Sequence, residues 1–181
     1  MGGSRLVRLI ERHSEELAIG LTAKLRQSER TADFRKIPAE DLQKTTAALY
    51  RNLGEWLLNK TEQDIEKHFV SIAVRRAADG VRLQQFVWAL IMSRNHLYRF
   101  LLGHAFADSI FELYSELELQ QLLNQFFERA TYYGVAAYEE VKDRAMLPVT
   151  RTRHESRSAM VCLVIGLAFR PAISRTAVGW K

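Results

Sequence analysis

Histidine, arginine and carboxylate side chains are the groups in this sequence with chemistry to offer, and their spacing limits what they can do. A di-iron carboxylate bundle needs a Glu three residues before a His, so that both ligands share one helix face. None of the five histidines has an acidic residue at that position. The sequence also lacks the His-Glu-x-x-His pattern of zinc proteases. We therefore predict no metal site and no cofactor.

Nucleophilic catalysis finds no support in the sequence either. There is no Gly-x-Ser-x-Gly elbow, no Walker A sequence and no Gly-x-Gly-x-x-Gly loop. The single cysteine, Cys162, lies in an apolar run over residues 160–169, where a thiol is usually inert. We predict no catalytic residue and a chain that is not an enzyme.

Basic side chains fall on or beside the two most apolar stretches of the chain. Arg94 lies on an apolar stripe between Leu90 and Leu97, and His68 and Arg76 belong to the preceding segment. A buried arginine needs a carboxylate, an anion or a path to solvent, because an unpaired buried charge is costly. One interpretation is that His68, Arg76 and Arg94 converge on a small polar pocket for an acidic ligand. The other is that each is a locally paired or snorkelling side chain.

Helices are predicted over most of the chain by the spacing of apolar residues. Prolines occur only at positions 38, 148 and 171, which leaves a long central stretch without a strong helix breaker. Thr61 is suited to an N-cap and Gly80 to a C-cap. The predicted helices cover about residues 4–28, 38–57, 61–80, 81–106 and 109–146, with Ser115 as an alternative start of the last. This pattern favours an all-α fold, a five-helix bundle or a globin-like domain with a long last helix.

The last predicted helix carries an apolar stripe that alternates steps of three and four residues, the period of a helix–helix seam. Two interpretations stay open: a dimerisation or signal-output helix, and a long core helix of a bundle. The stripe consists of Leu119, Leu123, Phe126, Ala130, Tyr133 and Ala137.

A globin-like arrangement would make haem an alternative ligand. Haem needs a proximal histidine that faces an apolar pocket, and His68, His96 and His104 are the candidates. A hydrogen-bonded core histidine is the competing interpretation of each.

Residues 148–181 differ from the rest of the chain and form a basic, partly apolar tail. The formal net charge is +5, and all of this excess lies in the tail. A nucleic-acid-binding domain would carry a basic face within its fold, so no nucleic-acid partner is expected. The apolar run over residues 160–169 is shorter than the roughly 20 residues that span a bilayer, so we expect no membrane association. We expect a disordered or truncated terminus.

The N-terminus lacks the apolar core of a secretory signal, and one cysteine suits a reducing compartment. We therefore expect a cytoplasmic protein.

Two stretches of this chain resemble a known protein family. The first is HFVSIAVRRAADGVRLQQFVWALIMSRNHLYRFL (68–101), with its early histidine, Arg76-x-x-x-Gly80 and an apolar helix containing Arg94. The second is FFERATYYGVAAYEE (126–140), which is similar to a closing helix. Both resemble the N-terminal domain of RsbRD-type RsbT co-antagonists, which also precedes bacterial histidine kinases.

The resemblance implies an all-α sensor domain, globin-like in related stressosome regulators, generally without haem, dimeric and attached to an output module. Residues 86–89 lack the acidic residue expected there, and no output domain follows residue 147. We therefore expect residues 4–147 to be a helical sensor and dimerisation domain in bacterial signal transduction, a homodimer that binds a protein partner. The alternatives are a globin-like binder of a small molecule, including haem, and an adaptor that contacts anionic partners through the tail.

Overall fold

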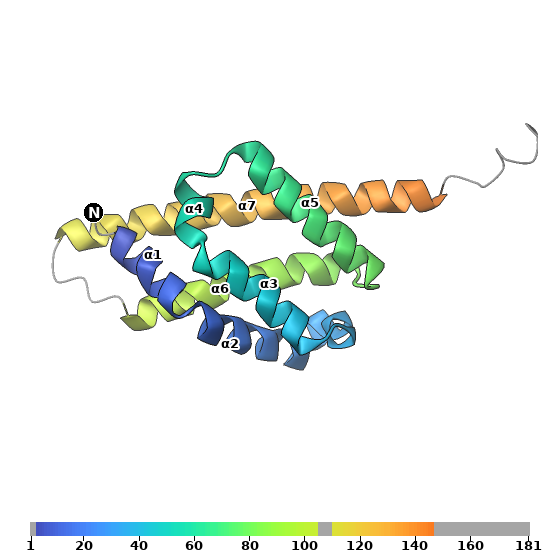
Figure 1. The fold of residues 1–181 in the computed structure, drawn as a ribbon, viewed down its shortest axis with the longest axis horizontal. Helices are drawn as coiled ribbons and strands as arrows, with labels where there is room; N and C mark the ends of the chain where they lie inside the picture. The colour runs from blue at the N-terminus through green and yellow to red at the C-terminus, as the bar shows by residue number, and fades with distance from the viewer. Residues whose placement is uncertain (1–2, 105–109, 147–181) are drawn as a thin grey trace, which may run out of the picture. The chain divides into compact units, whose positions relative to one another are not determined.

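The computed structural model of this chain describes residues 3–104 and 110–146 (Figure 1). The described residues form seven α-helices and one 3₁₀ helix and contain no strand, which confirms the predicted all-α class. In chain order the elements are α1 (Gly3–Arg12), α2 (Ser14–Gln27), η1 (Glu29–Lys36), α3 (Ala39–Arg51), α4 (Leu53–Leu58), α5 (Glu62–Ala78), α6 (Leu83–His104) and α7 (Ile110–Met146).

Two of the predicted helices are each broken into two. The first breaks at His13, whose φ of −97° and ψ of 17° lie outside the helical region. The second breaks at Asn52, with φ −115° and ψ 27°, between α3 and α4. Neither break falls at a proline or glycine, so the spacing of apolar residues predicted one continuous helix through each of these points.

The ends of α5 follow the predicted caps. The Thr61 hydroxyl accepts a hydrogen bond from the Asp64 amide at 3.2 Å, and the Asp64 carboxylate accepts one from the Thr61 amide at 3.0 Å. This reciprocal capping box satisfies two amides that the first turn leaves without partners. Gly80 has φ +76°, the left-handed conformation that glycine adopts without steric cost.

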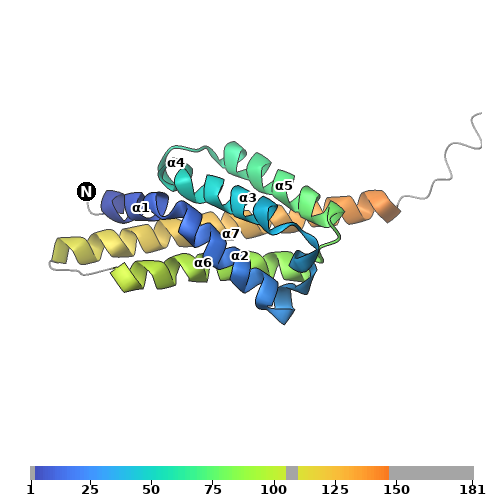
Figure 2. The ribbon, with the colours of Figure 1, turned by 60° about the horizontal axis from the view of Figure 1, so that its bottom comes forward.

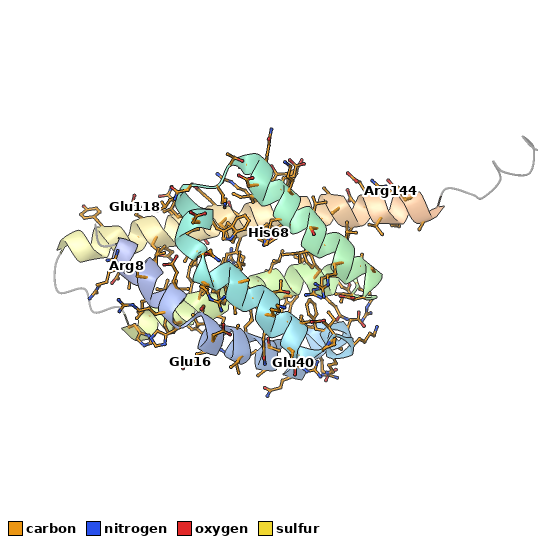
Figure 3. The ribbon with its side chains drawn as sticks, viewed as in Figure 1. Arg8, Glu16, Glu40, His68, Glu118 and Arg144 are labelled. Carbon is orange, nitrogen blue, oxygen red and sulfur yellow. The ribbon has the colours of Figure 1, made fainter. Side chains whose placement is uncertain are left out.

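Helices α6 and α7 run side by side in opposite directions (Figures 1 and 2). Near one end the Tyr98 hydroxyl donates to Asn124 Oδ1 at 2.6 Å, and near the other Phe86 lies against Gly134. Helix α2 packs on this pair through α6 and also contacts α3 and η1. Helix α5 packs on the pair as well, and the rings of its Phe69 and of Phe126 in α7 have centroids 5.4 Å apart. Side chains from these helices fill the space between the ribbons (Figure 3). The chain divides into two compact units after Asp143, and of the described residues 3–104 and 110–143 belong to the first unit.

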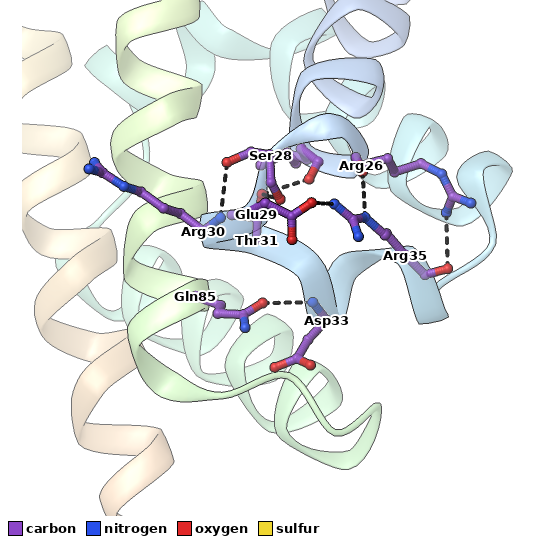
Figure 4. Close-up of polar contacts among 9 residues, drawn as sticks. Arg26, Ser28, Glu29, Arg30, Thr31, Asp33, Arg35 and Gln85 are labelled. Carbon is purple, nitrogen blue, oxygen red and sulfur yellow. Dashed lines mark hydrogen bonds and ion pairs between the residues drawn. The ribbon is translucent and has the colours of Figure 1, made fainter.

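The 3₁₀ helix η1 was not predicted. Ser28 caps it by accepting a hydrogen bond from the Arg30 amide at 3.2 Å, and the Thr31 hydroxyl donates to the Leu25 carbonyl at 2.6 Å (Figure 4). The Asp33 amide donates to Gln85 Oε1 of α6 at 2.7 Å. These contacts hold η1 against the end of α2 and the start of α6.

Acid should weaken the fold through Asp33. Its carboxylate accepts hydrogen bonds from Lys36 Nζ at 2.9 Å and Arg82 Nε at 2.9 Å, which lower its pKa from 3.8 to about 2. A depressed pKa contributes stability above pH 3.8 that is lost as the pH falls towards 2. We expect urea unfolding at a series of pH values to show this loss in the native chain. The Asp33→Asn variant should not show this part of the loss of stability. It should retain only the loss due to other carboxylates such as Asp64, whose pKa is also lowered, by hydrogen bonds to Thr61. An unchanged acid profile in Asp33→Asn would contradict this assignment.

Candidate ligand-binding cavity

A small central cavity, partly open to solvent, lies between α2, α3, α5, α6, η1 and α7. Its volume is about 90 Å³. Its polar lining comes from Thr45, Thr46, Tyr50, Arg76 and Ser93. The rest of the lining is apolar: Leu21, Leu25, Phe34, Leu42, Leu49, Phe69, Ile72, Phe86, Ala89, Leu90 and Phe127. The amphipathic helices that meet here therefore leave a mostly apolar space with a few polar groups.

Tyr50, in the last turn of α3, is the polar group of this lining with an unmet hydrogen bond. It is fully buried, and its hydroxyl has no hydrogen-bond partner among the described residues. Burial raises the pKa of Tyr50, and a weak hydrogen-bonding interaction with the Ser93 side chain opposes this increase. The Ser93 hydroxyl donates its own proton to the Ala89 carbonyl at 2.8 Å, and although its oxygen could still accept one, Ser93 and Tyr50 do not meet in the geometry of a full hydrogen bond. The Tyr50 hydroxyl therefore stays unpaired. Leaving such a group unpaired costs about 1–3 kcal/mol.

Arg76 brings a cation to the same cavity. Its side chain is 4% exposed, and its Nη1 donates to Asp79 Oδ2 at 2.8 Å. Tyr138 of α7 lies near this pair: burial raises its pKa, Arg76 lowers it and Asp79 raises it. The Tyr138 hydroxyl also lacks a hydrogen-bond partner among the described residues. The C-terminal end of α5 thus holds a buried arginine whose charge is paired with Asp79, three residues further along the chain.

The three basic residues proposed from the sequence do not share one pocket. Arg76 lines the central cavity, whereas Arg94 lines an adjoining hollow between α6 and α7 that shares Leu90 and Phe127 with this cavity. His68 lies on the side of α5 that faces α4, with its ring 4.4 Å from that of Trp56 (Figure 3).

His68 and Arg94 each keep one buried nitrogen without a hydrogen bond in the described part of the chain, Nε2 and Nε respectively. Burial lowers the pKa of His68, which favours a neutral ring against Trp56. Of the three residues, only Arg76 lines the central cavity, and the lining of this cavity is mostly apolar.

The apolar stripe of α7 faces the core of the chain itself. Five of its six members are buried and Tyr133 is half-buried, so the pattern marks a core helix, the second of the two interpretations. The Tyr133 hydroxyl donates to Glu62 Oε1 of α5 at 2.7 Å. The outward side of α7 carries other residues, among which Tyr114, Leu117 and Tyr132 are exposed. The members of the core stripe are Leu119, Leu123, Phe126, Ala130, Tyr133 and Ala137.

The residues around the cavity do not fit haem. No histidine belongs to the lining, and haem needs an axial ligand that faces its pocket. His96 and His104 line other hollows, and His68 packs on Trp56. Among the described residues, no three His, Cys, Asp or Glu side chains come together as a metal site would require.

Comparison of the chain with protein-family models, with curated proteins and with solved structures finds no match. Across residues 3–104 and 110–146, no helix combines the length and the apolar character needed to cross a membrane. The basic tail of residues 148–181, and with it the predicted adaptor role, lies outside the described residues.

Proposed function

We propose that this chain is a non-catalytic regulatory module, a sensor domain of bacterial signal transduction that binds a small molecule in the central cavity. The Tyr50 hydroxyl is the observation that carries this proposal. A fully buried hydroxyl without a partner, on the wall of an apolar cavity, leaves a hydrogen bond for a ligand to make. Arg76 supplies a second polar group on the same wall.

The size and lining of the cavity define the class of ligand. A volume of about 90 Å³ has room for several water molecules or for one small organic molecule of a few non-hydrogen atoms. The apolar lining favours a hydrocarbon body, and Tyr50 favours one hydroxyl or carbonyl group. Because Asp79 already pairs with Arg76, a neutral ligand suits the site better than an acidic one. The ligand is thus a small neutral molecule with an apolar body and one hydrogen-bonding group.

Helix α7 is the element that would report occupancy. Phe127 lines the cavity, and the adjacent Phe126 packs on Phe69 of α5 and near Trp56 of α4, with centroid distances of 5.4 and 6.4 Å. A ligand that displaces Phe127 changes the packing of α7 on several helices at once, because packed interiors move between discrete arrangements. Contact with a second copy of the chain or with another protein would then use the outward residues of α7, since its apolar stripe is in the core.

Tyr50→Phe tests the proposal, with isobutanol as the probe. Removing an unpaired buried hydroxyl should leave the free energy of unfolding unchanged or raise it by about 1 kcal/mol. The same substitution should weaken isobutanol binding about fivefold to tenfold, because the probe loses its hydrogen bond. Urea unfolding measures the first effect, and amide NMR titration measures the second.

Tyr132→Phe is the matched control, because that tyrosine is 70% exposed and lies outside the cavity lining. It should change neither quantity. Saturable binding that is equally strong in native chain and Tyr50→Phe would contradict the role of Tyr50, and the absence of saturable binding would contradict the proposed class of ligand. A clear loss of stability in Tyr50→Phe would show that the hydroxyl already has a protein partner.

A further inference from the structure

The hollow lined by His96 lies where the end of α2 meets α6, and it shares no lining residue with the central cavity. Its volume is about 340 Å³. Its lining includes Lys24, Arg30, Trp88, Asn95, His96 and Arg99. Three cations and an imidazole therefore surround this space, and no carboxylate lines it.

Lys24 is paired with a neutral group here. Its ammonium lies 2.8 Å from Nδ1 of His96, and because an ammonium can only donate, that ring nitrogen must accept. Nε2 then carries the proton and donates to the Leu17 carbonyl at 3.1 Å. Burial lowers the pKa of His96, and the charges of Lys24 and Arg99 lower it further, against the opposing effect of the Leu17 hydrogen bond. The imidazole is neutral, so it orients the ammonium without cancelling its charge.

The two arginines also keep their charges uncompensated. Arg30 lies over the ring of Trp88, with 4.5 Å from its guanidinium carbon to the ring centroid, and Arg99 is exposed. Many basic residues of the described chain pair with a carboxylate, as Arg35 does with Glu29 at 2.5 Å and Arg129 with Glu62 at 3.3 Å. None of the ion pairs among the described residues includes Lys24, Arg30 or Arg99.

We propose that this hollow binds the phosphate group of a small molecule. A phosphate dianion matches several positive charges better than a monocarboxylate does, and a guanidinium can hold it through two parallel hydrogen bonds. Lys24 has two further N–H donors beside the one that faces His96. The Asn95 amide adds an uncharged donor on the same lining. The ring face of Trp88 attracts the Arg30 guanidinium, and both side chains line the hollow.

Titration of the full chain with inorganic phosphate at constant ionic strength tests this site. The NMR signal of the His96 ring should shift saturably, because His96 lies next to Lys24. Bound phosphate should also raise the pKa of His96, since a nearby anion favours the charged imidazolium. Arg99→Gln and Lys24→Gln should each weaken phosphate binding about tenfold, the effect of losing one charge-assisted hydrogen bond.

Arg129→Gln is the control for the loss of one positive charge, because Arg129 pairs with Glu62 on another face. It should leave the affinity unchanged. Equal weakening in Arg129→Gln, or the same His96 shift in chloride alone, would overturn the proposal by showing a general response to salt. The absence of a saturable shift would overturn it as well.

Two further arms distinguish the source of the phosphate. Glycerol phosphate represents a soluble monoester, and vesicles of phosphatidic acid in phosphatidylcholine represent a lipid headgroup. Competition by glycerol phosphate, with no sedimentation of the chain on vesicles, assigns the site to a soluble ligand. Sedimentation that Arg99→Gln abolishes and Arg129→Gln does not assigns it to a headgroup. Failure of both arms would overturn the proposal. None of these readouts depends on Tyr50 or on the central cavity.

Discussion

Truncation of Leu123 to alanine should lower the free energy of unfolding by about 2–5 kcal/mol, the range for fully buried leucines. Leu123 has no exposed surface and lies in the apolar stripe of α7 that faces the core. The loss combines the transfer of the missing methyl groups with the cavity that they leave. Urea unfolding followed by circular dichroism at 222 nm, a standard helix signal, measures it.

Leu117→Ala provides the matched control on the same helix. Leu117 is 53% exposed, and surface substitutions of this kind usually change stability by less than about 0.5 kcal/mol. A large loss at Leu117 together with a small one at Leu123 would mean that the stripe faces a partner and that the core assigned to α7 is wrong.

Gly134→Ala should destabilise the chain by about 2 kcal/mol, although alanine is the better helix former. A Cβ at this position would lie 2.4 Å from Cε1 and 3.1 Å from Cζ of Phe86. Phe86 is buried and packs against Tyr138, with ring centroids 5.2 Å apart, so it has little room to move. Overpacking of this kind costs about 1–3 kcal/mol, and the short contact places the cost at the upper end, above the gain of about 1 kcal/mol in helix propensity.

Gly103→Ala is the control for helix propensity. Among the described residues, no atom outside its own stretch of helix lies within 4 Å of a Cβ built on Gly103, so alanine there should stabilise the chain by up to about 1 kcal/mol. Equilibrium unfolding of both variants measures the contrast. A stabilised Gly134→Ala would show that α6 and α7 are further apart at Phe86 than the fold places them.

The sequence predicted the ends of a helix correctly where capping residues themselves form those ends. Thr61 and Gly80 limit α5 because their caps depend on neighbouring residues alone. The breaks at His13 and Asn52 depend on how the two halves of each helix pack, and no residue type marks them. The same holds for η1, which is held by contacts such as that between Asp33 and Gln85, 52 positions apart in the chain.

The candidate site was predicted only in part, for a related reason. Arg76 was found because a charge on an apolar helix is unusual in any context. Tyr50 was missed because a tyrosine next to Leu49 on an amphipathic helix has the appearance of an ordinary core residue, and its unmet hydrogen bond depends on which helices surround it. His68 and Arg94 lie on apolar helices, as Arg76 does. The packing of the neighbouring helices nevertheless places both of them outside the lining of the central cavity.

The α7 stripe shows a further limit of sequence patterns. Its spacing describes a helix that packs on another helix and does not tell whether that helix belongs to the same chain. Burial of Leu119, Leu123 and Phe126 among residues of the same chain resolves that choice for the stripe. Dimerisation itself stays a prediction that concerns the outward side of α7.

Amide NMR titration of the native chain with isobutanol is the most direct measurement of whether the central cavity is a sensor site. We predict saturable shifts at Tyr50 and Ser93, which line the cavity, and at Phe127 and its neighbours on α7. In Tyr50→Phe the same shifts should need about fivefold to tenfold more isobutanol. Shifts confined to exposed residues, or saturable shifts at Tyr50 that leave α7 unchanged, would contradict a cavity whose occupancy is reported by that helix.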